Sequence, residues 1–183
     1  MRKGLLGMIL VLIVCLSACA TSKTDSKSAM DTNENEIRAK IGDNIGSLKR
    51  KAGNRICYER YSCLAWENSE TYYIACTGQK GETVRGVAVF SKNLELINAT
   101  GIEPIEDIVE DEWVGKLEKD FVDQYGQCHF EEGSGLYMPS YISKTGKIYS
   151  LYVDGGRIYR IACRILNKQP LPIIVIDTDT WDG

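Results

Sequence analysis

The sequence contains one histidine, His129, and only three phenylalanines among its 183 residues. With a single histidine and nothing to say which serine would join it, no Ser-His-Asp triad can be argued. No pair of its cysteines has the two-residue spacing of a zinc knuckle. Its glycines do not form the phosphate loop that opens a nucleotide-binding helix. These absences count against an enzyme and against a bound metal or cofactor.

Positive charge is scarce as well. The 22 Lys and Arg residues are outnumbered by 25 Asp and Glu residues, which gives a formal net charge of −3. Nucleic-acid binding needs a positive surface that neutralises phosphates, so this balance argues against it. Tyrosine, in contrast, is plentiful: ten residues form an aromatic set typical of surfaces and interfaces.

Three features that look like chemical sites have plainer explanations. Cys128 and His129 are neighbours, but adjacent strand residues point to opposite faces, so we expect no catalytic pair. The acidic run from Glu103 to Glu112 fits the beginning of a helix, where carboxylates complement the dipole. The ending Asp177-Thr178-Asp179 is similar to part of a calcium loop, but such a loop needs about twelve residues and a closing carboxylate. We expect no bound metal. Calcium binding by the acidic C-terminus is the one exception that the sequence leaves open.

Residues 1–19 have the composition of a targeting segment. Two cations, Arg2 and Lys3, precede an uncharged apolar stretch from Gly4 to Leu16. A membrane-spanning helix needs about 20 apolar residues, so this stretch is too short to be one. A basic start followed by a short apolar run is instead typical of a secretory signal.

The signal ends in Leu16-Ser17-Ala18-Cys19, which resembles the lipobox of bacterial lipoproteins. The resemblance implies that Cys19 carries a thioether-linked diacylglycerol and becomes the mature N-terminus. Two or more acyl chains make a stable membrane anchor, whereas one chain is marginal. We therefore expect a protein tethered to the extracytoplasmic face of the cell membrane. An ordinary signal cut after Ala18 or Ala20 is the alternative.

Beyond the signal, composition divides the chain into four parts. Residues 20–36 are mostly Ser, Thr, Lys, Asp, Asn and Glu, which bury too little apolar surface to offset their ordering entropy. We predict a disordered linker there, a first repeat at 37–101, a second repeat at 102–167 and a C-terminal extension at 168–183. The extension contains a short predicted strand, Leu171 to Ile176.

The two repeats are recognised from landmarks that recur 73 residues apart. Each set consists of a glycine, a short helix with apolar residues on one face, and a glycine suited to ending that helix. An apolar stripe from Ile105 to Trp113 predicts a further helix before the second set, with 33–41 as its weaker counterpart. The landmark pairs are Gly42 and Gly115, Leu48 and Phe121, and Gly53 and Gly126.

Each helical segment is followed by segments with the alternation and the Gly- and Asp-containing turns of strands. A turn such as Asp154-Gly155 is a strong hairpin signal. The fold class is therefore α+β, with two tandem repeats in which one or two helices precede an antiparallel meander packed on them. The predicted strands are Arg55–Trp66, Thr71–Thr77, Thr83–Ser91, Leu94–Asn98, Gly135–Ser143, Lys147–Val153 and Arg157–Ile165, with a further short strand between Gln127 and Gly135.

A glycine-bounded helix before a meander resembles the small bacterial lipoproteins of the SmpA/OmlA outer-membrane assembly type. Its tandem duplication resembles the β-lactamase-inhibitor-protein fold. The resemblance covers about Ile37 to Leu166. Where that family usually has Met-Thr after the first glycine, this chain has Asp43-Asn44 and Lys116-Leu117. The resemblance implies sheets with helices on one side and the other side free.

Alternation along the predicted strands selects residues for that free face. A turn at Ser69-Glu70 places Trp66 opposite Tyr73, and Arg60 is expected on the same face. In the second half Tyr152 and Arg160 are expected to face outward, whereas Tyr159, Ile161, Cys163 and Ile165 face the core. An outer face with Trp, Tyr and Arg has the composition of a protein-binding surface, although these residues could also pack against the other repeat or the tail. The candidate partner-binding residues are Arg60, Trp66, Tyr73, Tyr152 and Arg160.

Five cysteines remain after Cys15 and Cys19, an odd number that is not a complete disulfide framework. The turn at Ser69-Glu70 also brings Cys63 opposite Cys76. A disulfide there and a pair of small buried apolar side chains are both open, and we favour the latter.

We therefore expect a lipid-anchored, non-enzymatic module that binds another envelope or secreted protein on an open sheet face, as an inhibitor-like binder would. An envelope assembly or structural factor is the first alternative. A solute-binding lipoprotein is the second, and it would need a deep pocket with paired carboxylates.

Overall fold

The computed structural model describes residues 36–78, 81–132 and 137–168. All of them belong to one compact unit that runs from Asn35 to Gly183. Within these residues no helix is both long enough and apolar enough to cross a membrane. The predicted lipidation site at Cys19, the linker up to residue 35 and the predicted C-terminal strand lie outside the described residues.

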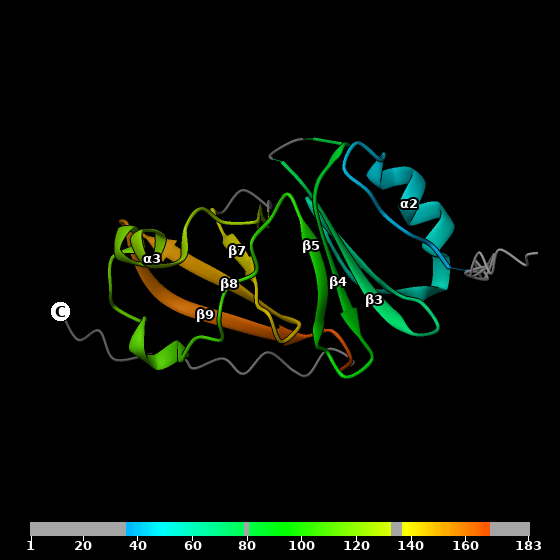
Figure 1. The fold of residues 1–183 in the computed structure, drawn as a ribbon. Helices are drawn as coiled ribbons and strands as arrows, with labels where there is room; N and C mark the ends of the chain where they lie inside the picture. Colours follow the sequence, from blue (N-terminus) through cyan, green and yellow to red (C-terminus); the bar gives the residue numbers. More distant parts are fainter. Residues whose placement is uncertain (1–35, 79–80, 133–136, 169–183) are drawn as a thin grey trace, which may run out of the picture. The chain divides into compact units, whose positions relative to one another are not determined.

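The described chain mixes helix and sheet, with antiparallel strands in two sheets and few helices. In the first sheet five strands lie side by side in chain order, each paired with the one before it. These strands are β1 (Ile56–Arg60), β2 (Cys63–Glu67), β3 (Thr71–Thr77), β4 (Val84–Ser91) and β5 (Leu96–Thr100). Figure 1 shows β3, β4 and β5 running alongside one another.

The second sheet is a four-stranded meander in the same simple order. Its two long strands form a hairpin whose turn contains Gly155 and Gly156, both with positive φ, as the Asp-Gly signal predicts. The strands are β6 (Phe130–Glu131), β7 (Pro139–Ile142), β8 (Lys147–Asp154) and β9 (Arg157–Ile165).

The two predicted glycine-bounded helices are confirmed as α2 (Ile45–Ala52) and α3 (Glu118–Tyr125). The side chain of Asn44 caps α2 by accepting the Ser47 N–H at 2.9 Å. Gly53 and Gly126 follow the two helices with φ of 52° and 81°, a region that favours glycine because it has no Cβ.

Each helix is tied to a hairpin of its own sheet by backbone hydrogen bonds. The N–H of Gly42, before α2, donates to the carbonyl of Val84 on β4 at 2.9 Å. The N–H of Gly115, before α3, donates to the carbonyl of Ile158 on β9 at 2.7 Å. Both glycines have positive φ, which lets the chain turn from the strand edge into the helix.

Three predicted elements are wrong. The predicted helix at 33–41 is not formed by its described residues, 36–41. The stripe from Ile105 to Trp113 is irregular except for η2, a 3-10 turn at Glu110–Glu112, although Ile105, Ile108 and Trp113 are buried. The predicted strand Arg55–Trp66 is two strands, β1 and β2, separated by a turn at Tyr61-Ser62. Apolar residues at helical spacing can therefore be buried by an irregular segment. A turn that contains neither Gly nor Pro cannot be recognised from the alternation of apolar and polar residues.

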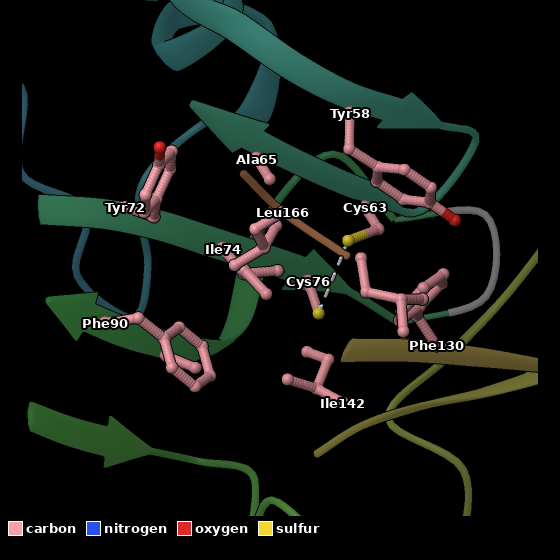
Figure 2. Packing of buried hydrophobic residues seen from close by; sticks show 12 residues of the cluster. Tyr58, Cys63, Ala65, Tyr72, Ile74, Cys76, Phe90, Phe130, Ile142 and Leu166 are labelled. Carbon is pink, nitrogen blue, oxygen red and sulfur yellow. Dashed lines mark hydrogen bonds between the residues drawn. The ribbon is translucent and has the colours of Figure 1, made fainter. Parts of the chain in front are cut away.

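The core has three clusters of buried side chains. Helix α2 covers one face of the first sheet, where Leu48 and Ala52 pack with Leu64 and Trp66. The opposite face packs against residues of the second sheet. Figure 2 shows this second cluster around two sulfur atoms, with Cys63 directly opposite Cys76 as predicted. Its members from the second half are Phe130, Ile142, Ile148 and Leu166.

The third cluster lies under α3, where Phe121 is fully buried against Tyr141 with ring centroids 4.9 Å apart. Trp113 meets the same phenylalanine edge-on at 4.7 Å. The first sheet is therefore covered on both faces. A candidate binding surface has to come from side chains of the second sheet that lie outside these clusters.

Candidate partner-binding surface

Trp66 and Tyr73 are paired across β2 and β3, as the turn at Ser69-Glu70 predicts, and their rings stack 5.5 Å apart. Trp66 is nevertheless 0% exposed, because α2 packs on this face. Its Nε1–H donates to the carbonyl of Ile37 at 3.0 Å, so its polar end is also satisfied inside the chain. The prediction that Trp66 lies on an open outer face is therefore wrong.

Arg60 does not share a face with Trp66, and that prediction is wrong too. It pairs with Cys63, so it lies on the face of the first sheet that packs against the second half. The turn at Tyr61-Ser62 is the reason, because it shifts the alternation between β1 and β2. There the Arg60 Nε–H donates to Glu132 at 3.2 Å.

Glu132 is a buried carboxylate that joins the two halves. Its side chain is 6% exposed, and its oxygens accept from Arg60, from the Ser150 hydroxyl at 2.8 Å, and from the Tyr58 hydroxyl. The Ser150 hydroxyl in turn accepts from Ser140 at 3.1 Å. A buried charge needs such partners, so this network is a structural joint rather than a free acid or base. The sequence reasoning missed Glu132, since only tertiary contacts distinguish it from its neighbour Glu131.

Two arginines lie next to the hydrogen-bond network of Glu132, on the ring of Tyr58. The guanidinium carbons of Arg60 and Arg164 lie 5.5 Å and 5.6 Å from the ring centre of Tyr58. Burial raises the pKa of the Tyr58 hydroxyl far above its ordinary value, and the charge of Glu132 adds to this, so the ring stays neutral. Arg164, which was not among the predicted residues, shares the strand face of Arg160.

A bulge in the β8–β9 hairpin exposes an aromatic side chain of the second sheet. Tyr152 pairs with Arg160, but the next residue, Val153, pairs with Ile158, so Tyr159 is the extra residue. A bulge re-aims side chains, and here it turns Tyr159 away from the core to an exposure of 46%. The prediction that Tyr159 faces the core is therefore wrong, and Ile158 takes that place with 0% exposure.

Tyr152, Tyr159 and Arg160 form a contiguous group, which we call the bulge cluster. The two tyrosine rings meet edge-on with centroids 6.0 Å apart. The guanidinium carbon of Arg160 lies 4.8 Å from the ring centre of Tyr152. The expected pairing of Tyr152 with Arg160 on one face is confirmed, and Tyr159 is the member that strict alternation missed.

The guanidinium of Arg160 is incompletely paired. Its Nε and Nη2 atoms are shielded from solvent and have no hydrogen-bond partner among the described residues. Charged N–H donors that lack both water and an acceptor are costly, so native structures rarely leave them so without a functional reason. The bulge cluster therefore has the composition of an interface hot spot and an unused hydrogen-bonding capacity.

A second bulge, in the β3–β4 hairpin, lies beside a pocket instead. Cys76 pairs with Gly86 and Thr77 with Val84, so Arg85 is the extra residue. The pocket has a volume of about 350 Å³. Its walls include Arg85, Gly86, Ile102, Glu103, Cys128 and His129.

His129 in this pocket has both ring nitrogens engaged. Nδ1 accepts the N–H of Ile142 at 2.8 Å, so Nε2 carries the hydrogen and donates to the carbonyl of Glu103 at 2.9 Å. Burial lowers the pKa of His129 to about 4, against the opposing effect of the Glu103 carbonyl. Burial also raises the pKa of the Cys128 thiol to about 11. Neither group has the properties of a nucleophile or base at neutral pH.

Among the described residues no group of three or more His, Cys, Asp or Glu side chains is arranged to hold a metal ion. Comparison with known proteins gives no match: no family model, no curated protein and no solved structure is similar to this chain. The surface must therefore be interpreted from its own geometry.

Proposed function

We propose that the chain is a lipid-anchored extracytoplasmic protein that binds another envelope or secreted protein through the bulge cluster, without catalysing a reaction. The observation that carries this proposal is Arg160, an arginine held on the Tyr152 ring with two N–H groups unpaired beside an exposed tyrosine. Tyr and Arg are the residues most enriched at the energetic centre of protein interfaces.

The membrane tether is part of the same proposal and depends on the lipobox-like Leu16–Cys19. A tether confines the domain to the space next to the membrane, which raises the effective concentration of any partner held there. Palmitate labelling of the full chain should mark the wild type and not the Cys19→Ala variant. An unlabelled wild type would remove the tether and leave the proposed surface untouched.

We also propose that the two halves are copies of one helix-then-meander unit, as the resemblance to tandem inhibitor-like folds implies. The supporting contacts recur at equivalent places. The N–H of Ile45 donates to the carbonyl of Glu82 at 2.8 Å, and 73 residues later the N–H of Glu118 donates to that of Gly156 at 2.9 Å. Each hairpin also has its bulge next to the strand residue, Val84 or Ile158, whose carbonyl accepts from Gly42 or Gly115.

The binding proposal is tested with the lipidated full-length protein in the cells that produce it. Proteins captured with the wild type are compared by quantitative mass spectrometry with those captured by Arg160→Ala and Tyr159→Ala. The matched control is Ile97→Ala, because Ile97 is 58% exposed on β5, away from the bulge cluster.

We expect at least one protein to be lost by about thirtyfold or more with both bulge-cluster variants and retained with the control, since hot-spot truncations cost about 2 kcal/mol or more. Identical capture profiles for all four proteins, with the variants still folded by circular dichroism, would contradict the proposal.

A further inference from the structure

Resting on the proposed function, we infer that the bulge cluster receives a carboxylate of an acidic polypeptide segment. The two unpaired atoms of Arg160, Nε and Nη2, form one edge of the planar guanidinium. Two parallel N–H bonds from such an edge match the two oxygens of a carboxylate, which gives a strong and directional contact.

The surroundings of Arg160 favour an anion. Arg60 and Arg164 lie on the same side of the molecule around Tyr58, and both are cations. Glu132 already accepts from Tyr58, Arg60 and Ser150, and its charge is paired with that of Arg60. Arg164, on the strand face of Arg160, adds a positive charge that attracts an incoming carboxylate, and Nε and Nη2 of Arg160 have no partner among the described residues for it to displace.

The aromatic members make a polypeptide the fitting carrier of this carboxylate. Tyr152 holds the guanidinium plane by a cation–π contact, which lowers the entropy lost on binding. Tyr159, the neighbour of Arg160 in the chain, is exposed, and rotation of such a side chain is fast, so its ring is free to pack on a bound segment. The apolar faces of the tyrosine rings, next to the charged guanidinium of Arg160, suit a peptide chain better than a lipid headgroup.

The test uses a fluorescein-labelled hexaglutamate peptide and the full-length lipidated protein in detergent micelles, with binding measured by fluorescence anisotropy. Hexaglutamine is the uncharged probe. Arg160→Lys keeps the charge but removes the fork, and Arg164→Gln removes one charge from the same strand face as a matched control. We expect hexaglutamate to bind, hexaglutamine not to bind, and Arg160→Lys to weaken binding about tenfold, with Arg164→Gln changing it less than threefold.

Three outcomes overturn the inference. The first is equal weakening by Arg160→Lys and Arg164→Gln, which means diffuse electrostatics. The second is binding to vesicles of anionic phospholipid that depends on Arg160, whereas hexaglutamate does not bind. The third is hexaglutamate binding only after removal of residues 169–183, which carry three aspartates and would then be the occupant. If capture in cells still depends on Arg160 in the first or second case, the proposed function stands and only the carboxylate falls. In the third case the carboxylate stands, and residues 169–183 of the chain itself replace the partner as its source.

A separate observation concerns Cys63 and Cys76, from which we infer a structural disulfide in the mature protein. The two residues are directly paired across β2 and β3, with sulfur atoms 3.8 Å apart, as Figure 2 shows. The neighbouring N–H of Thr77 donates to the carbonyl of Ser62 at 2.8 Å, so Cys63 and Cys76 occupy a non-hydrogen-bonded site of the ladder. There the Cα atoms lie about 4.5 Å apart, inside the range that a disulfide spans.

Forming this bond requires rotation of two side chains and removal of two electrons and two protons. The oxidant is a protein disulfide, which takes up both by thiol–disulfide exchange and leaves as a dithiol. Both thiols are 1% exposed, and burial raises the pKa of Cys63, so exchange must precede burial during folding in the extracytoplasmic space.

The test is the mass of the protein purified from its membrane under conditions that block free thiols, followed by proteolysis. We expect the peptides with Cys63 and Cys76 to be linked and two hydrogens lighter than the separate thiols, and Cys57, exposed on β1, to be alkylated as the internal control. Full alkylation of Cys63 and Cys76 after denaturation, with Cys57 also alkylated, would overturn the inference.

Discussion

Two of the bulged hairpins, β3–β4 and β8–β9, use the same backbone device for opposite purposes. At the first bulge Gly86 lies under Ile102, and a Cβ placed there would come within 2.3 Å of an Ile102 methyl. At the second bulge the corresponding residue is Arg160, whose side chain lies on Tyr152 beside exposed Tyr159. The first bulge is closed by the chain that follows β5, whereas at the second bulge Tyr159 is exposed and Arg160 is partly exposed.

This difference indicates that the bulge determines which side chains change face. The residue that follows the bulge determines whether another segment of the chain packs onto that site. Where the residue after the bulge is glycine, a following segment packs onto it and the site becomes part of the fold. Where it is arginine beside tyrosines, the same geometry leaves large side chains at the surface that we propose as the binding site.

Replacing Glu132 by alanine should cost about 3–5 kcal/mol of unfolding free energy, because Tyr58 and Ser150 would be left buried without an acceptor. Urea unfolding followed by tryptophan fluorescence measures this loss. Glu59→Ala on the same strand as Tyr58 is the control, and its exposed ion pair with Lys49 predicts little change. A near-wild-type Glu132→Ala protein would show that the joint between the halves does not depend on this network.

Lowering the pH should destabilise the folded protein through His129, which lines the pocket beside the β3–β4 bulge. The pKa of His129 is lowered to about 4 by burial, whereas an unfolded histidine has a pKa of about 6.5. Between these values the unfolded chain binds more protons, so stability falls as pH falls from 6.5 toward 4, by up to about 3 kcal/mol. Unfolding free energies across this range should show the slope in the wild type. In His129→Gln the slope should be largely lost; an unchanged slope would assign it to other groups.

Replacing Gly86 by valine should destabilise the protein by about 1–3 kcal/mol, since the new side chain meets Ile102 in a packed site. The double variant Gly86→Val with Ile102→Ala should recover part of the loss, because the obstructing methyl groups are gone. Thermal unfolding of the single and double variants measures both effects. No loss in the single variant would mean that the first bulge is not closed as described.

At the open bulge, Arg160→Ala should change the unfolding free energy by less than about 0.5 kcal/mol, since loss of the cation–π contact with Tyr152 is offset by removal of two shielded N–H groups that lack a partner among the described residues. Its effect should appear in binding alone. A loss comparable to that of Gly86→Val would make Arg160 a packing residue and remove the contrast between the two bulges.

The regular elements were accessible from sequence because their determinants are local. Strands Thr71–Thr77 and Arg157–Ile165 have the predicted bounds, and α2 and α3 lie between the predicted glycines. Alternation and glycine positions encode these features within a few residues.

The features that form the candidate surface could not be predicted in the same way. A bulge changes the face of Tyr159 without any change in the residue pattern, and the turn at Tyr61-Ser62 reversed the face of Arg60 relative to Trp66. The burial of Trp66 and the role of Glu132 depend on which segments meet in three dimensions. Residue types therefore predicted a candidate surface made of Tyr and Arg. Which tyrosines and arginines belong to it depends on the bulges and turns of the backbone.

The central claim is tested most directly by a photo-crosslinking amino acid placed at the extra residue of each bulge, Tyr159 or Arg85, in the lipidated full-length protein within its own cells. Both positions are exposed, so they differ in their surroundings rather than in access. We predict a discrete crosslinked protein from position 159 that disappears with Arg160→Ala, and none from position 85. The same product from both positions, or none from position 159, would contradict the account.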